Sequence, residues 1–101
     1  MTDVTRAREA LVTRILEGDG RASPAQRRAA FAREGLDEPL QTLVRKVAEH
    51  AHRVTDADVA AARAAGLSED QVFELVVCAA VGQASRQYDA ALAALRAAEG
   101  T

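Results

Sequence analysis

Ser68-Glu-Asp-Gln-Val-Phe-Glu-Leu-Val-Val-Cys-Ala-Ala-Val-Gly82 is the stretch that decides the fold. Ser68 followed by Gln71 is a capping box, the arrangement that starts a helix. Leu75 to Gly82 carries no charge on any side, so protein must surround this part of the helix. No proline follows, and Gly100 stands where a C′ glycine ends a helix. We therefore predict a long C-terminal helix whose apolar middle is covered partly by other copies of the chain.

The composition of the whole chain favours helices. Its 101 residues are 49% hydrophobic and only 3% aromatic. Alanine and leucine, which are abundant here, lose least on entering a helix, whereas the aromatic and β-branched residues that favour strands are scarce apart from valine. This length is typical of one domain. We expect a single all-α domain over residues 1–101.

Caps and glycines divide the rest of the chain into four shorter helices. The signals are those of ordinary helix starts and stops. The third, fourth and fifth helices should be neighbours, because the connections after Gly35 are short. The expected helices run from Thr2 or Asp3 to Glu17; from Ser23-Pro24 to Gly35; from Pro39 along an apolar stripe of Leu40, Leu43, Val44, Val47, Ala51 and Val54; and from the Thr55-x-x-Asp58 capping box to Gly66.

Charge and cysteine content narrow the function classes. A net charge of -2 argues against nucleic acid and anionic membranes as partners. One cysteine excludes an internal disulfide, and an uncharged run of this length cannot span a bilayer. These features favour a cytoplasmic protein. The basic N-terminal region could bind the phosphates of a nucleic acid, although a solvated face is the preferred reading of Arg14, Arg21, Arg27, Arg28 and Arg33.

The second half of the chain resembles the carboxymuconolactone decarboxylase and AhpD-like (alkylhydroperoxidase D-like) family. The resemblance rests on Val54-Thr-Asp-Ala-Asp-Val, on Ala62-Arg-Ala-Ala-Gly-Leu-Ser-Glu-Asp-Gln-Val-Phe-Glu-Leu-Val-Val, and on Ala79-Ala-Val-Gly. It covers a core of residues 38–98, with the N-terminal helices of residues 1–37 outside it. It implies a bundle of about five helices, assembled as a dimer to hexamer through the last helix. The interface residues we expect are Phe73, Val76, Val77, Ala80, Val81 and Tyr88.

The family's catalytic residues are missing from this sequence. AhpD-like peroxidases use a Cys-x-x-Cys pair and a histidine four residues later. Those positions fall at Ala51, Val54 and Asp58 here. Neither Ala51 nor Val54 can form a thiolate or a disulfide, so the resemblance does not extend to thiol peroxidase chemistry, and it implies no cofactor.

Four other residues are of types that could carry chemistry. His50 lies near the apolar stripe and is expected to point inward, whereas His52 points about 200° away, so the pair cannot bind one metal ion. Glu74 is the only charge between Gln71 and Ser85. It could pair with a buried His50 as acid and base, or with an arginine that fixes the helix register. Cys78 lies in the uncharged run and reads as a small buried hydrophobic residue.

Two functions from different classes follow. The first is an oligomeric, non-redox binding or accessory protein of AhpD-like fold that takes a small-molecule ligand. The alternative is a decarboxylase-like enzyme in which His50 and Glu74, with Asp58 as a further candidate, act on a small molecule. Nucleic-acid binding through the N-terminal arginines is a third, weaker hypothesis. We expect no metal site.

Overall fold

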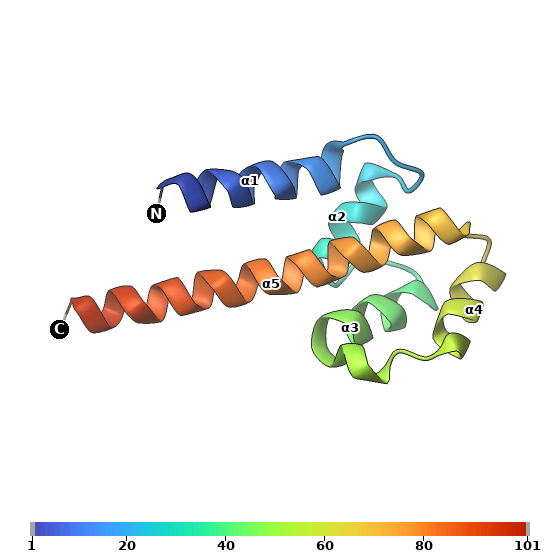
Figure 1. Ribbon diagram of the computed structural model, residues 1–101. Helices are drawn as coiled ribbons and strands as arrows, with labels where there is room; N and C mark the ends of the chain where they lie inside the picture. Colours follow the sequence, from blue (N-terminus) through green and yellow to red (C-terminus); the bar gives the residue numbers. More distant parts are fainter. Residues whose placement is uncertain (1, 101) are drawn as a thin grey trace.

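The computed structural model describes residues 2–100, and every regular element in this range is helical. The all-α prediction is confirmed (Figure 1). The long C-terminal helix and the four shorter ones lie close to their predicted places. They are α1 Thr2–Glu17, α2 Pro24–Ala32, α3 Leu40–His50, the short 3-10 helix η1 Ala51–Arg53, α4 Asp56–Ala64 and α5 Glu69–Glu99.

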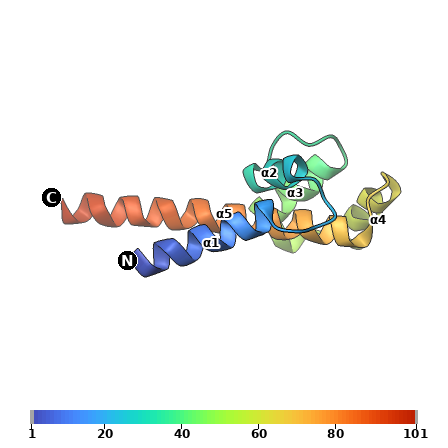
Figure 2. The same cartoon turned by 90° about the horizontal axis from the view of Figure 1, so that it is seen from above.

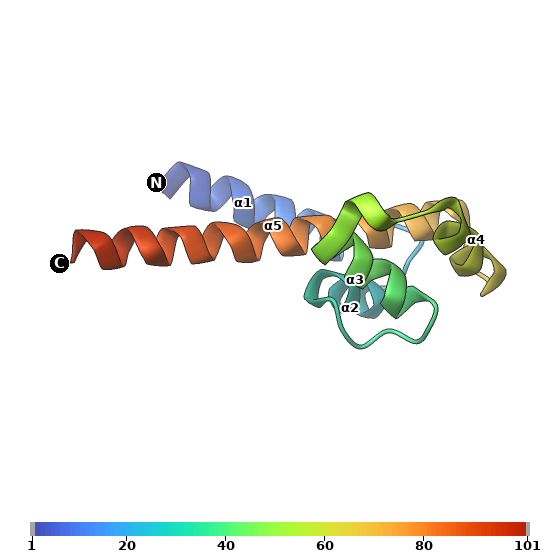
Figure 3. The ribbon, with the colours of Figure 1, turned by 90° about the horizontal axis from the view of Figure 1, so that it is seen from below.

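The 31-residue helix α5 is the axis of the molecule. Ser68 accepts a hydrogen bond from the Gln71 amide, and the Gln71 side chain accepts one from the Ser68 amide, which completes the predicted capping box. Helices α2, α3 and α4 pack around the first half of α5 (Figures 1 and 2). Helix α1 runs antiparallel beside α5, and the C-terminal turns of α5 extend beyond the other elements (Figure 3).

The core lies between α5 and the α2–α3 layer. Leu43 and Val44 of α3 are buried against Leu75, Cys78 and Ala79 of α5. Helices α3, α4 and α5 are mutual neighbours, as the short connections predicted. Helix α2 packs on α5 at least as extensively as α3 does, so the N-terminal part of the chain belongs to the same core.

Gly82 allows the close approach of α2 to α5. A methyl group built on Gly82 would lie 2.1 Å from the Phe31 carbonyl oxygen at the end of α2. Arg86, one turn further along α5, donates from Nη1 to the same oxygen at 2.7 Å. The helix continues unbroken past Gly82, which is therefore a contact point and not a bend.

Three helix ends differ from the sequence prediction. Helix α3 ends at His50 (φ -149°, ψ 61°), so the helical stripe predicted through Val54 stops one turn early and Ala51 is exposed. Helix α2 ends at Ala32, because Arg33 takes a left-handed conformation (φ 58°) before Gly35. Gly100 has φ -75°, so it ends α5 without the left-handed turn expected of a C′ glycine.

Candidate functional site

The turn between α1 and α2 is fixed to α5 by the carboxylate of Glu74. Glu74 accepts from the Arg21 amide at 2.7 and 2.9 Å and from the Ala22 amide at 3.1 Å. Two main-chain N–H groups that would otherwise need water are thereby satisfied by one side chain. The carboxylate thus meets the main chain of Arg21 and not an arginine guanidinium, which was the predicted partner. Both carboxylate oxygens of Glu74 therefore accept hydrogen bonds that hold the turn in place.

Arg27 holds the other side of the same turn. It is only 5% exposed, and its Nη1 donates to the carbonyl oxygens of Gly18 at 2.7 Å and Ile15 at 3.3 Å. These carbonyls lie at the end of α1, where the helix has no partners of its own for them. The reading of Arg27 as part of a solvated face is wrong. No local pattern distinguishes it from Arg28, because its burial depends on how α1 docks.

A pocket of about 420 Å³ opens beside Arg27 and Glu74. This size falls within the range of small-molecule sites. Apolar side chains of α1 and α5 form most of its wall, and Arg14 and Asp19 line it together with the buried Arg27 and the half-buried Glu74. Its apolar lining is Leu11, Ile15, Phe73 and Val77.

Cys78 lies in the wall of this pocket but is a poor nucleophile. It is 1% exposed, and its thiol donates to the Ile15 carbonyl oxygen at 3.7 Å. Burial raises the pKa of the Cys78 thiol above its ordinary value of 9.0, and the Arg27 charge opposes this only in part. The thiolate that redox chemistry requires is therefore disfavoured at neutral pH.

His50 does not point inward, contrary to the sequence expectation. It ends α3 and is exposed, and its ring lies edge-on to that of His52 at 6.0 Å between centroids. The end of α3 and the α1–α2 turn lie on different sides of α5 (Figure 1), so His50 does not join Glu74 at the pocket. The physical reason is the break at His50, which turns the last residues of α3 away from the core. Among residues 2–100 no group of three or more His, Cys, Asp or Glu side chains could hold a metal ion.

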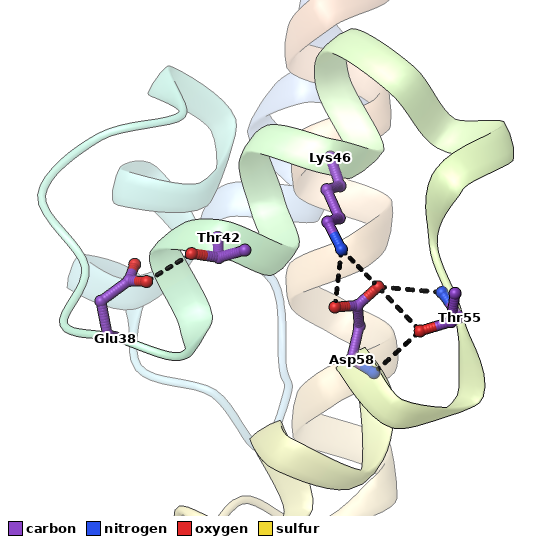
Figure 4. A network of polar contacts seen from close by, with 5 residues as sticks. All are labelled: Glu38, Thr42, Lys46, Thr55 and Asp58. Atoms are coloured by element: carbon purple, nitrogen blue, oxygen red, sulfur yellow. Dashed lines mark hydrogen bonds and ion pairs between the residues drawn. The ribbon is translucent and has the colours of Figure 1, made fainter.

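Asp58, a candidate residue of the sequence analysis, ties α4 to α3. Its carboxylate accepts from Lys46 Nζ at 2.9 and 3.0 Å and from the Thr55 amide at 2.9 Å (Figure 4). One turn before Lys46 along α3, Thr42 donates to Glu38 in the same group of polar contacts (Figure 4). Hydrogen bonds from Lys46 and from the Thr55 amide hold the pKa of Asp58 below its ordinary value of 3.8. Ala51 is exposed and Val54 is half-buried.

The low pKa of Asp58 predicts a pH-dependent stability. A carboxyl whose pKa is lower folded than unfolded stabilises the fold at neutral pH, and the contribution disappears as the pH falls below 3.8. We expect Asp58→Asn to lower the urea midpoint at pH 7 and to lower it by less at pH 3, because the carboxylate begins to lose its contribution once the pH falls below 3.8. Asp56→Asn, an exposed first-turn aspartate of the same helix, is the control and should change little. An equal loss for Asp58→Asn at both pH values would contradict this account.

The residues predicted for an oligomer interface do not all face outward. Phe73 is 68% exposed and Ala80 is exposed, whereas Val77, Val81 and Tyr88 are half-buried. Val76 packs against the core and therefore lies on a different side of α5. Of the eight residues from Leu75 to Gly82, one copy of the chain thus buries four and half-buries three, and Ala80 is exposed.

Comparisons of this chain with protein-family models, with curated proteins and with solved structures found no match. Within residues 2–100, no helix combines the length and the hydropathy that crossing a bilayer requires.

Proposed function

We propose that this chain is an AhpD-like binding or accessory protein that works as an oligomer and without thiol redox chemistry. The observation that carries the proposal is the pocket between α1 and α5. The side chains beside the pocket that could take part in a reaction already have structural roles. Glu74 accepts hydrogen bonds from two main-chain amides, Arg27 donates to two carbonyl oxygens, and the Cys78 thiol is buried. Such a pocket is suited to holding a molecule and not to transforming it.

The polar residues of the pocket favour a ligand that carries hydrogen-bond acceptors. Arg27 Nε is buried without a hydrogen-bond partner among the described residues, and Arg14 stands at the rim. The oxygens of Glu74 already accept from main-chain amides, which reduces their repulsion of an anion. A small molecule with an apolar body against Leu11 and Phe73 and an anionic end near the arginines fits this arrangement.

Titration with anilinonaphthalene sulfonate, followed by its fluorescence, tests the proposal. This dye has an apolar ring system and one negative charge. We expect saturable binding that Arg14→Ala weakens about five-fold, because an exposed ionic contact contributes roughly 1 kcal/mol. Arg6→Ala removes the same charge from an exposed position of α1 that does not line the pocket, and should bind like the unaltered protein.

Two results would overturn the proposal. If Arg14→Ala and Arg6→Ala bound the dye equally well, the dye would not occupy the pocket. Consumption of hydrogen peroxide that stops in Cys78→Ser would show a redox function that the buried thiol argues against.

A further inference from the structure

A second pocket, of about 310 Å³, lies between α1 and α5 beside Phe31 near the end of α2. It shares no lining residue with the pocket beside Glu74. Its volume is at the lower limit of small-molecule sites, so an occupant must be small. Most of the side chains that line it are polar or charged, which distinguishes it from the other pocket and narrows the chemistry of a ligand.

Ser85 of α5 places a buried hydroxyl group in the wall of this second pocket. The residue is only 9% exposed, and its side chain forms no hydrogen bond with another residue of the range 2–100. Buried polar groups in folded proteins nearly always have a hydrogen-bond partner. A ligand with a hydrogen-bond acceptor would supply the partner that the protein does not.

Arg86, the next residue of α5, brings a positive charge that no carboxylate of the described chain neutralises. Its Nη1 donates to the Phe31 carbonyl oxygen at 2.7 Å and its Nη2 to Gln83 Oε1 at 3.1 Å, and both acceptors are uncharged. Its Nε is buried without a partner among residues 2–100. Burial, and then the nearby Arg33 charge, lower the pKa of the Arg86 guanidinium, so its positive charge is poorly solvated. A carboxylate in the pocket would stabilise this charge.

Glu9 of α1 brings a negative charge to the same pocket. Its carboxylate is exposed and forms neither an ion pair nor a hydrogen bond within the described part of the chain. The other two charges in the lining, Arg8 and Asp89, lie 2.7 Å apart and neutralise each other. The pocket therefore presents one unpaired positive charge on α5 and one unpaired negative charge on α1.

We propose that this pocket binds a small zwitterion, a free α-amino acid with an apolar side chain, between α1 and α5. At neutral pH such a molecule carries one carboxylate and one ammonium group. The carboxylate lies against Arg86 and Ser85, and the ammonium group faces Glu9. Val12 and Phe31 provide apolar surface for the side chain. A peptide terminus carries only one of the two charges, so the free amino acid is the better match.

Isothermal titration calorimetry with leucine and with two singly charged analogues tests this site. Isocaproate is leucine without its amino group, and isoamylamine is leucine without its carboxyl group. Because each analogue lacks one ionic contact, we expect leucine to bind about five-fold more tightly than either of them.

Glu9→Gln removes the negative charge from a side chain that makes no other contact. We expect this variant to bind leucine about five-fold more weakly and to bind isocaproate as the unaltered protein does. Asp3→Asn is the matched control, because Asp3 is an exposed acidic residue of the same helix that does not line the pocket. It should bind leucine as tightly as the unaltered protein.

Arg86→Met removes the positive charge and keeps the aliphatic stem. We expect leucine and isocaproate to bind about ten-fold more weakly, since hydrogen bonds from a charged group are stronger than those between neutral groups. Binding of isoamylamine should not change, because it has no carboxylate. The unchanged isoamylamine affinity would also show that the pocket keeps its shape without the bond from Arg86 to Phe31.

Three results would overturn the proposal. The first is the absence of saturable leucine binding. The second is equal affinity of the unaltered protein for leucine and isocaproate, which would show that the ammonium group makes no contact. The third is an equal effect of Glu9→Gln and Asp3→Asn on leucine binding. If Arg86→Met lost all three ligands by unfolding, the Glu9→Gln result would decide alone. The pocket beside Glu74 enters none of these measurements, so the proposed function does not depend on their outcome.

Discussion

Gly82→Ala should destabilise the fold by about 3 kcal/mol, the upper range of the cost of overfilling a packed core. The added methyl group would lie 2.1 Å from the Phe31 carbonyl oxygen and 2.9 Å from its carbonyl carbon. Both are main-chain atoms of α2, so relief requires the two helices to move apart. Such a movement also lengthens the hydrogen bond from Arg86 to the Phe31 oxygen. Urea denaturation followed by circular dichroism measures the loss.

The same substitution at an open position provides the control. Gly100 lies at the end of α5 with φ -75°, and a methyl group there would come no closer than 3.4 Å to a neighbouring atom. Gly100→Ala should therefore leave the unfolding midpoint nearly unchanged. In a free helix, glycine to alanine stabilises by roughly 1 kcal/mol. A gain of that size for Gly82→Ala would show that α2 and α5 are not in close contact.

Arg27→Met is expected to cost about 2–3 kcal/mol, since hydrogen bonds from a charged group contribute roughly 1.5–3 kcal/mol. Methionine keeps the aliphatic stem and removes both bonds to the end of α1. The carbonyl oxygens of Ile15 and Gly18 would then lose their donor next to the core. Hydrogen exchange should show the loss first in α1, because α1 has fewer contacts with the rest of the fold than α2 or α3 has.

Arg28→Met is the matched control on the next residue. Arg28 pairs with Glu17 at 3.2 Å, but both side chains are more than half exposed. Exposed pairs of this kind contribute at most about 1 kcal/mol. A cost for Arg28→Met equal to that for Arg27→Met would mean that the burial of Arg27 contributes nothing to the docking of α1.

The sequence prediction was wrong about His50 and about Arg27, for two different reasons. His50 was expected to point inward because it continues the spacing of Leu43 and Val47, yet α3 ends at that residue. Arg27 was grouped with the solvated arginines because its neighbours resemble them. His50 is exposed because the backbone leaves the helical conformation there. The burial of Arg27 depends on its contacts with the end of α1, and the helical spacing of α2 carries no information about those contacts.

The sequence by itself determined the number, order and approximate limits of the helices. Helix ends are set by the capping boxes at Thr55 and Ser68 and by prolines and glycines. These act through hydrogen bonds and backbone angles within a few residues, so the sequence alone predicts them. Only the tertiary structure decided what Glu74 and Arg27 do. Their partners lie 53 and 9 residues away in the sequence, and they meet only because α1 folds back along α5.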